Sequence, residues 1–173
     1  MGKKSVKENK NIYQLSREDK GLTRAEASEA LEFVSESRIE KIESEKSEPH
    51  PEEILAMAKA YQKPELCNYY CSQKCPIGQE YVPEVEMREL SQIVLEMLAS
   101  LNSLNKEKDR LIEISSDGVI SEDELMDFAI IRDRLDKISL TIDSLQLWVN
   151  HMIASGAIDK ERLSEAQEKI KHL

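Results

Sequence analysis

The sequence predicts an all-α protein, in which a bundle of short helices precedes a long antiparallel helical hairpin and a short C-terminal helix. Apart from Gly2, the glycines and prolines lie between segments whose apolar residues recur every three or four positions, which is the period of an amphipathic helix. No stretch alternates apolar and polar residues as a half-buried strand does. Charged residues make up 34% of the chain and aromatic residues 5%, a composition typical of exposed helices.

Length and composition exclude several classes of protein. The 173 residues fit one domain of ordinary size or two small ones. We expect a cytoplasmic protein without a membrane span, because no run of 18 apolar residues occurs and the start, "MGKKSVKENK", is polar. The net charge of −10 is uneven, with −1 on residues 1–63 and −9 on residues 64–173. A nucleic-acid site is therefore expected in the first part, because the second would repel a phosphate backbone.

Short helices are predicted in the first third of the chain. The first spans about residues 9–20 and ends at Gly21. Thr23 and Glu26 form a capping box that opens the second helix. After a turn at residues 32–35, the third helix spans about 36–45. Pro51 opens the fourth, since proline is favoured in the first turn of a helix.

Several short motifs follow one another across these helices. They are Arg17, "GLT" at 21–23, "IEKIE" at 39–43, Pro49 and "ILAMAKAY" at 54–61. In this order and at nearly this spacing, the chain over about residues 9–65 resembles the Cro and phage-repressor (XRE) family of helix-turn-helix transcription regulators. The resemblance implies a domain at 9–64 that binds double-stranded DNA. The basic tail at 1–8 is expected to add phosphate contacts.

The resemblance also implies roles for individual residues. Arg17 and Glu43 match the structural ion pair that ties the first helix to the third. Leu15, Leu31, Ile39 and Ile42 are expected in the core. The start of the second helix is placed to meet phosphate, the start and outer face of the third to read base edges, and the following loop to approach the backbone. The residues implied for these DNA contacts are Thr23, Arg24, Ser35, Glu36, Ser37, Arg38, Lys41 and Lys46.

The segment departs from the family pattern in ways that bear on function. The turn before the third helix is one residue longer than usual, and Glu32 lies near the usual turn glycine. Residues 35–48 carry more acidic than basic side chains, which opposes affinity for DNA. An alternative function is therefore a protein-interaction module that uses the helix-turn-helix fold as a scaffold.

The junction at residues 65–83 contains all three cysteines, Cys67, Cys71 and Cys75. Their spacing of four places them on one face of a helix that is expected to end near Cys75, because Pro76 follows. Three interpretations remain open. The cysteines pack as small buried hydrophobes, bind zinc or an iron–sulfur cluster, or form a thiol switch. An odd number of cysteines argues against a disulfide framework. Apart from the metal or cluster interpretation of the cysteines, no cofactor is expected.

Residues 84–173 are predicted to form the hairpin and a last helix after Gly156. Two rows of apolar residues at alternate spacings of three and four predict long, coiled-coil-like helices. Between them, "EISSDGVISEDE" at 113–124 partly matches a calcium loop, but Gly118 as a helix stop and a Ser121–Glu124 capping box explain the same residues. The rows are Met87, Leu90, Val94, Met97, Leu101, Leu104 and Leu111, and then Phe128, Ile131, Leu135, Ile138, Ile142, Leu145, Val149 and Met152.

One hairpin cannot bury both rows and the apolar residues beside them, so we expect a homodimer held by residues 84–155. The alternative is that the last helix and the N-terminal part cover these rows within one chain. An enzyme is not expected, because the sequence has no nucleophile–base pairing or phosphate loop and His50, His151 and His172 are scattered. The sequence therefore predicts a dimeric DNA-binding transcription regulator.

Overall fold

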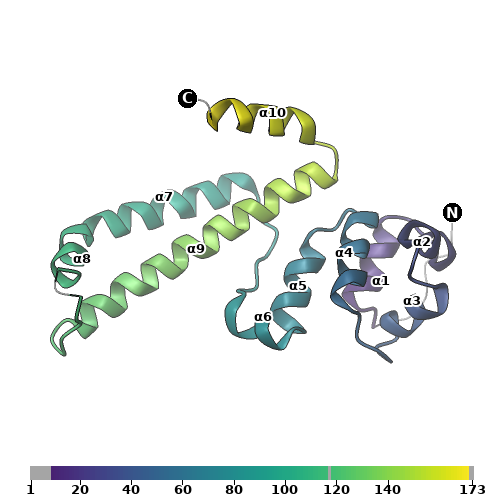
Figure 1. Ribbon diagram of the computed structural model, residues 1–173, viewed down its shortest axis with the longest axis horizontal. Helices are drawn as coiled ribbons and strands as arrows, with labels where there is room; N and C mark the ends of the chain where they lie inside the picture. Colours follow the sequence, from purple (N-terminus) through teal and green to yellow (C-terminus); the bar gives the residue numbers. More distant parts are fainter. Residues whose placement is uncertain (1–8, 117, 172–173) are drawn as a thin grey trace. The chain divides into compact units, whose positions relative to one another are not determined.

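The computed structural model describes residues 9–116 and 118–171, and Figure 1 shows these as helices joined by short connections. The predicted all-α class is confirmed, since no strand occurs in these two ranges. None of the described helices is both long and apolar enough to cross a bilayer. The helices are α1 (Ile12–Asp19), α2 (Arg24–Leu31), α3 (Glu36–Glu43), α4 (Pro51–Ala60), α5 (Glu65–Gln73), α6 (Pro76–Tyr81), α7 (Leu90–Lys106), α8 (Lys108–Ile114), α9 (Leu125–Ala154) and α10 (Lys160–Lys171).

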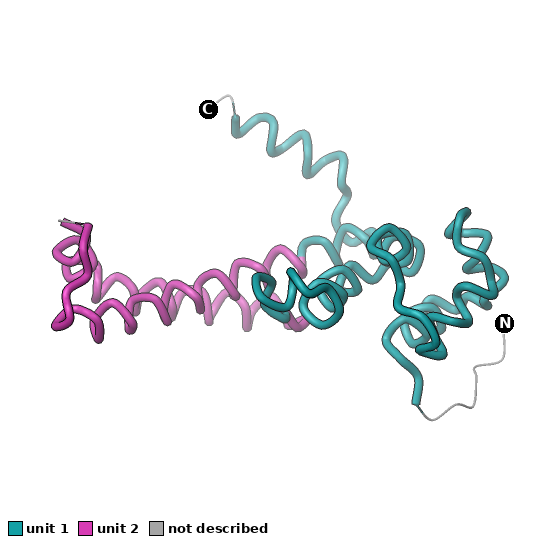
Figure 2. Tube along the Cα trace, turned by 60° about the horizontal axis from the view of Figure 1, so that its bottom comes forward, with its two compact units in different colours: residues 1–84, 149–173 teal, residues 85–148 magenta. Residues whose placement is uncertain are grey.

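The chain divides into two compact units, coloured separately in Figure 2. The first unit combines residues 1–84 with 149–173, so that the end of α9 groups with the N-terminal helices. The second unit is residues 85–148 and contains α7, α8 and most of α9. The basic tail at 1–8, Asp117 of the partial calcium loop and His172 lie outside the described residues.

Local capping explains where the N-terminal helices begin. The Asn11 side chain accepts a hydrogen bond from the Gln14 amide at the start of α1 (3.0 Å). Thr23 and Glu26 form the capping box of α2, and Ser35 caps α3 by accepting from the Arg38 amide. Each cap satisfies backbone N–H groups that have no partner within their own helix.

The core of the first unit is assembled from one face of each of the helices α1 to α5. Ile39 and Ile42 are fully buried, as their place on the inner face of α3 requires. Leu15, expected in this core, is about half exposed, and its neighbours Tyr13 and Gln14 are buried instead. The core residues are Tyr13, Ala27, Leu31, Val34, Ile39, Ile42, Ile54, Met57, Ala58, Tyr61 and Leu66.

The junction folds into two short helices that pack closely. The chain leaves helical geometry at Cys75 (φ −82°, ψ 120°), directly before Pro76, and α6 then turns back against α5. A Cβ atom at Gly78 would lie 2.0 Å from the carbonyl oxygen of Cys71. Only glycine therefore permits this approach of the two backbones.

The hairpin in the second unit differs in two details from the prediction. Its first helix begins at Leu90, and a break at Glu107 (φ −97°, ψ 1°) separates α7 from α8. At the closed end, Arg110 pairs with Asp127 across 2.6 Å and Arg134 with Glu107 across 3.2 Å. The first pair joins α8 to α9, and the second joins the break to α9.

The inner side of the hairpin is partly built from small polar residues. Ile93 and Ile131 are buried, but so are Thr141 and Ser144 on α9. The Thr141 hydroxyl donates to the carbonyl of Lys137 (2.9 Å) and the Ser144 hydroxyl to that of Leu140 (2.8 Å). Because each hydroxyl bonds within its own helix, these side chains can be buried without an unsatisfied polar group.

Candidate nucleic-acid interface

Helix α3 presents a polar face to solvent while its apolar face lies in the core. Ser37 and Lys41 are exposed and four residues apart, so they are neighbours on one side of the helix. Glu36 and Glu40 flank them and are also exposed. This face therefore offers one hydroxyl, one ammonium group and two carboxylates to a partner.

A buried charge cluster fixes α1 against α3. The Arg17 guanidinium donates two hydrogen bonds to Glu43, from Nε to Oε1 (2.6 Å) and from Nη2 to Oε2 (3.0 Å), and a third to the carbonyl of Leu22. Burial alone would lower the pKa of Arg17, but the bond and charge of Glu43 outweigh it and the pKa is raised. Arg17 therefore stays charged where it is buried beside Glu43.

Arg24, at the start of α2, belongs to the same cluster. Its Nε atom donates to Glu43 Oε2 at 2.8 Å, and about a third of its side chain is exposed. The Thr23 hydroxyl, one residue earlier, bonds to the Glu26 carboxylate. Of the two residues implied for phosphate contact here, Arg24 retains an exposed edge that an anion could approach.

Arg38 is turned away from the exposed face of α3 toward α4. It donates to both carboxylate oxygens of Glu53 (2.7 Å each), to the Ser47 hydroxyl (2.5 Å) and to the carbonyl of Glu48 (2.8 Å). Burial by itself would raise the pKa of Glu53, but Arg38 and the His50 amide lower it. Arg38 thus ties the third helix to the start of the fourth and to the loop between them.

The turn between α2 and α3 has strained backbone geometry. Glu32 has φ 60° and ψ −53°, and the Phe33 amide donates to the carbonyl of Leu31 across 2.6 Å, which closes a three-residue turn. Positive φ in a residue other than glycine costs free energy. The Ser28 hydroxyl, which donates to the carbonyl of Val34 (2.9 Å), secures the far side of the turn.

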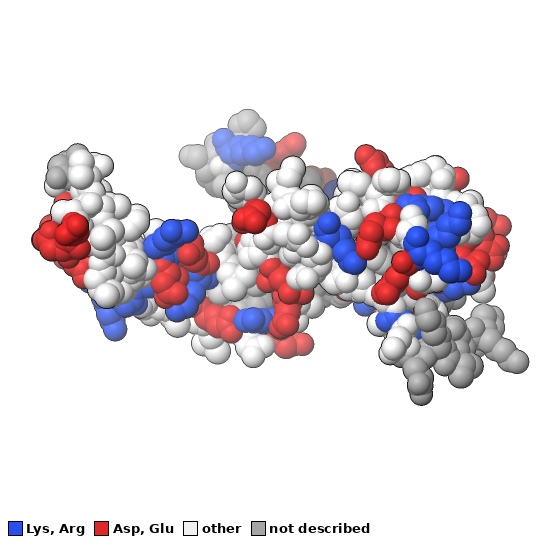
Figure 3. Space-filling view, turned by 90° about the horizontal axis from the view of Figure 1, so that it is seen from below, with Lys and Arg blue, Asp and Glu red and all other residues white. Residues whose placement is uncertain are grey.

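The charges around α3 are mixed. Figure 3 shows Lys and Arg side chains gathered over the N-terminal helices, with Asp and Glu side chains directly beside them. Lys41 and Lys46 are exposed, and no ion pair involves either of them within the described ranges. Glu36, Glu40 and Glu45 are exposed nearby. The face is therefore close to neutral or slightly acidic.

The three cysteines lie in the junction, on α5 and at the start of α6. Across residues 9–116 and 118–171, no three Cys, His, Asp or Glu side chains come together in a way that could hold a metal ion. All three thiols are free and partly exposed. Cys67 packs against the core of the first unit, and this burial raises its thiol pKa. At neutral pH the thiol therefore stays protonated, which favours the packing interpretation.

Comparison with known proteins supports the resemblance that the sequence motifs carry. Residues 15–66 match the family model described as Helix-turn-helix, so this segment, from the middle of α1 to the start of α5, is a helix-turn-helix domain. No curated protein and no solved structure matches the chain. The remaining helices therefore have to be interpreted from their own residues.

Proposed function

From this helix-turn-helix domain, we propose that the protein is a sequence-specific DNA-binding transcription regulator that acts as a homodimer. The observation that carries the proposal is the match of residues 15–66 to the helix-turn-helix family. The arrangement of α3 supports it. Its inner face is fixed by Ile39, Ile42 and Glu43, which leaves its outer face free for the major groove.

The exposed side chains of α3 suit contacts with base edges. Lys41 can donate to guanine, Ser37 can donate or accept, and Glu36 can accept from the amino group of cytosine. Lys46, in the loop after α3, is free to meet a phosphate. Arg24 and the N-terminus of α2 are proposed as a second phosphate contact.

We assign Arg38 a different part from the base contact that the sequence implied. Reaching a base edge would break its bonds to Glu53, Ser47 and Glu48. Charge-assisted hydrogen bonds of this kind are strong. Arg38 is proposed to position α3 and not to read DNA.

Dimerisation is proposed through one broad side of the hairpin. Val94 and Leu101 on α7 are seven residues apart, as are Leu135 and Ile142 on α9, so each pair lies on one side of its helix. All four are 40–45% exposed in the single chain. A second hairpin would bury these rows in a four-helix bundle. Such a dimer suits two half-sites about 34 Å apart.

The acidic character of the α3 face favours a second candidate, a protein-interaction module. Glu36, Glu40 and Glu45 would repel phosphate while attracting a basic surface on another protein. In that case the helix-turn-helix fold acts as a scaffold only.

Binding to fragments of genomic DNA, measured at several salt concentrations, separates the two candidates. A regulator retains a subset of fragments, and its affinity falls steeply with salt because counterions are released. Lys41→Ala weakens this binding, whereas Lys59→Ala, which changes an exposed lysine on α4, does not. Absence of binding at low salt overturns the DNA-binding proposal and leaves the interaction module.

A further inference from the structure

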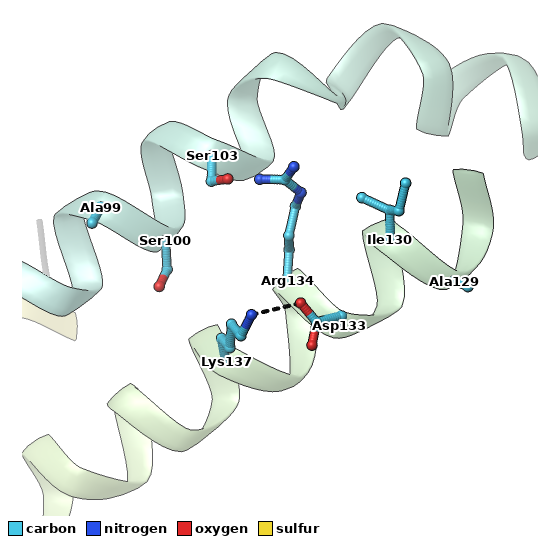
Figure 4. A pocket seen from close by; sticks show the side chains of 8 residues that line it. All are labelled: Ala99, Ser100, Ser103, Ala129, Ile130, Asp133, Arg134 and Lys137. Carbon is cyan, nitrogen blue, oxygen red and sulfur yellow. Dashed lines mark hydrogen bonds and ion pairs between the residues drawn. The ribbon is translucent and has the colours of Figure 1, made fainter. Parts of the chain in front are cut away.

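A hollow of about 550 Å³ lies between α7 and α9 in the second unit. Figure 4 shows Ser100 and Ser103 on the α7 side, with Asp133, Arg134 and Lys137 opposite them on α9. Ala99, Ala129 and Ile130 provide the apolar part of the lining. The volume falls within the range usual for small-molecule sites, and an apolar lining with a few polar groups is typical of them.

Arg134 is incompletely satisfied at this position. Its Nε atom is buried and has no hydrogen-bond partner, although the guanidinium lies 3.2 Å from Glu107 through Nη2. Figure 4 shows the side chain reaching across the hollow toward Ser103. A buried donor without an acceptor costs free energy. The Arg134 side chain is 26% exposed, so a turn of the guanidinium would bring Nε to an oxyanion in the hollow. That oxyanion would supply the missing acceptor, since guanidinium groups match carboxylates in geometry.

The hollow brings two basic side chains together in an acidic part of the chain. Arg134 and Lys137 line it together with one acidic residue, Asp133, and Glu107 pairs with Arg134 beside it. The charges here therefore balance, whereas residues 64–173 carry −9 overall. Lys137 pairs with Asp133 at 2.7 Å, but both side chains are more than 60% exposed, so the pair is weak and its ammonium group can turn to a ligand.

The hollow and the proposed dimer face lie on opposite broad sides of the hairpin. On α7, exposed Val94 directly follows buried Ile93, and on α9, exposed Ile142 directly follows buried Thr141. Successive residues of a helix are turned by about 100° around its axis. Val94 and Ile142 are therefore each turned by this angle, in the same sense, away from the inner side of the hairpin. In the lining of the hollow, Ala99 directly precedes half-buried Ser100 on α7, and Asp133 directly precedes half-buried Arg134 on α9. Ala99 and Asp133 are therefore turned away from the inner side in the opposite sense. Because the helices are antiparallel and face each other, a dimer through the apolar rows leaves the hollow open.

We propose that this hollow binds a small organic carboxylate. Arg134 and Lys137 would hold the carboxylate, the serine hydroxyls would donate to it from α7, and a short apolar body would lie against Ile130 and the two alanines. This site stands independently of DNA binding, so its test needs no DNA.

The test follows the side-chain Nε–H signal of Arg134 by NMR in the full-length protein. Three probes are titrated at constant ionic strength: benzoate, inorganic phosphate and benzyl alcohol. We expect benzoate to shift the signal saturably with a Kd of about 1 mM or lower, and phosphate to bind at least about tenfold more weakly for lack of apolar contact. Benzyl alcohol, which has the apolar body without the charge, should give no saturable shift.

Variants assign the contacts, with benzoate binding followed through backbone amides of α7 and α9. Arg134→Gln should weaken binding at least about tenfold and Lys137→Gln by a smaller factor, since each removes a charged donor. Arg132→Gln is the matched control, because Arg132 lies on the same helix, is mostly exposed and does not line the hollow. Arg132→Gln should bind benzoate with the same Kd as wild type. Lys137 is exposed, so Lys137→Gln also tests the site should Arg134→Gln unfold.

Three results overturn the proposal. If no probe shifts the Arg134 signal saturably up to about ten times the expected Kd, the hollow holds water only. If phosphate binds as tightly as benzoate, the site takes a bare oxyanion and not an organic carboxylate. If Arg132→Gln weakens binding as much as Arg134→Gln, the anion binds by general charge on α9.

Discussion

Arg38 and Glu53 join α3 to α4 through two hydrogen bonds of 2.7 Å, between Nε and Oε1 and between Nη2 and Oε2. Sequence resemblance placed Arg38 among base-reading residues, but in the structure its guanidinium bonds to its own domain. The position of α3 therefore depends on this pair as well as on Arg17 and Glu43.

Arg38→Ala is expected to lower the free energy of unfolding by about 1–3 kcal/mol, because it leaves the largely buried Glu53 carboxylate without its charged partner. Lys41→Ala, three residues on at an exposed position, should change the free energy of unfolding by less than about 0.5 kcal/mol. Urea unfolding measures both. An Arg38→Ala protein as stable as wild type would show that the pair contributes nothing to the fold.

The Glu53 carboxyl predicts how stability responds to acid. Its pKa in the folded protein is lower than the ordinary value of 4.5 because Arg38 and the His50 amide outweigh the effect of burial. The unfolded chain therefore binds the proton more tightly, and stability is lost as the pH falls below about 4.5. Glu53→Gln should flatten this part of the curve of unfolding free energy against pH. An unchanged curve would assign the acid response to other carboxyls.

The apolar rows of the hairpin predict how the protein assembles. Leu101→Glu combined with Ile142→Glu places charges in both rows and should convert a dimer to monomers, as measured by light scattering. Both positions are 42–45% exposed in the single chain, so the hairpin itself should still fold. The control is Asn102→Glu with Gln146→Glu, which adds the same charge at exposed polar positions. A wild-type monomer at micromolar concentration would contradict the dimer.

Glu32 predicts a stabilising substitution. Glu32→Gly removes the side chain from a residue at φ 60° and should raise the free energy of unfolding by up to about 1 kcal/mol, after the greater flexibility of glycine in the unfolded chain is subtracted. Glu29→Gly, within α2, should instead lower it by about 1 kcal/mol. Thermal unfolding of the two variants measures both changes in stability. If Glu32→Gly lowered the stability as Glu29→Gly does, the turn would not be strained.

Gly78 predicts the reverse of the usual effect of alanine in a helix. Gly78→Ala would bring a Cβ atom 2.0 Å from the Cys71 carbonyl oxygen, so α5 and α6 must separate, at a cost of about 1–3 kcal/mol. Glu80→Ala, at an exposed position of the same helix, should be nearly neutral. Loss of helix packing would appear as a lower melting temperature. If Gly78→Ala had the same melting temperature as wild type, α5 and α6 would be able to separate at little cost in free energy.

The sequence predicted the elements better than the contacts between them. Gly21 and the Thr23 capping box determine where helices end and begin through residues adjacent in sequence. These helix ends can therefore be predicted from the sequence alone. The bonds of Arg38 within its own domain could not be predicted, because its partners are nine to fifteen residues away and meet it only after the loop at residues 44–50 has turned. No local pattern distinguishes such an arginine from a free one.

The hairpin shows a second limit of the sequence. Its apolar rows predicted two long helices with more apolar surface than one hairpin can bury, and Val94, Leu101 and Ile142 are 40–45% exposed in the single chain. Thr141 and Ser144 are buried instead. A search for apolar periodicity does not identify such residues, because Thr and Ser are polar. They can be buried here only because their hydroxyls donate hydrogen bonds to carbonyls of the preceding helical turn.

The two ends of the hairpin consequently differ in how they respond to ionic strength. At its closed end, the pairs of Arg110 with Asp127 and of Arg134 with Glu107 are partly exposed, so dissolved salt weakens them. In the middle of α9, small side chains such as Thr141 and Ser144 are buried, and their hydroxyls bond to carbonyls of the same helix. Dissolved salt hardly affects such contacts. Added salt should therefore speed amide hydrogen exchange in α8 while the middle of α9 stays protected. The hairpin would open first at its closed end, and the middle of α9 would open last.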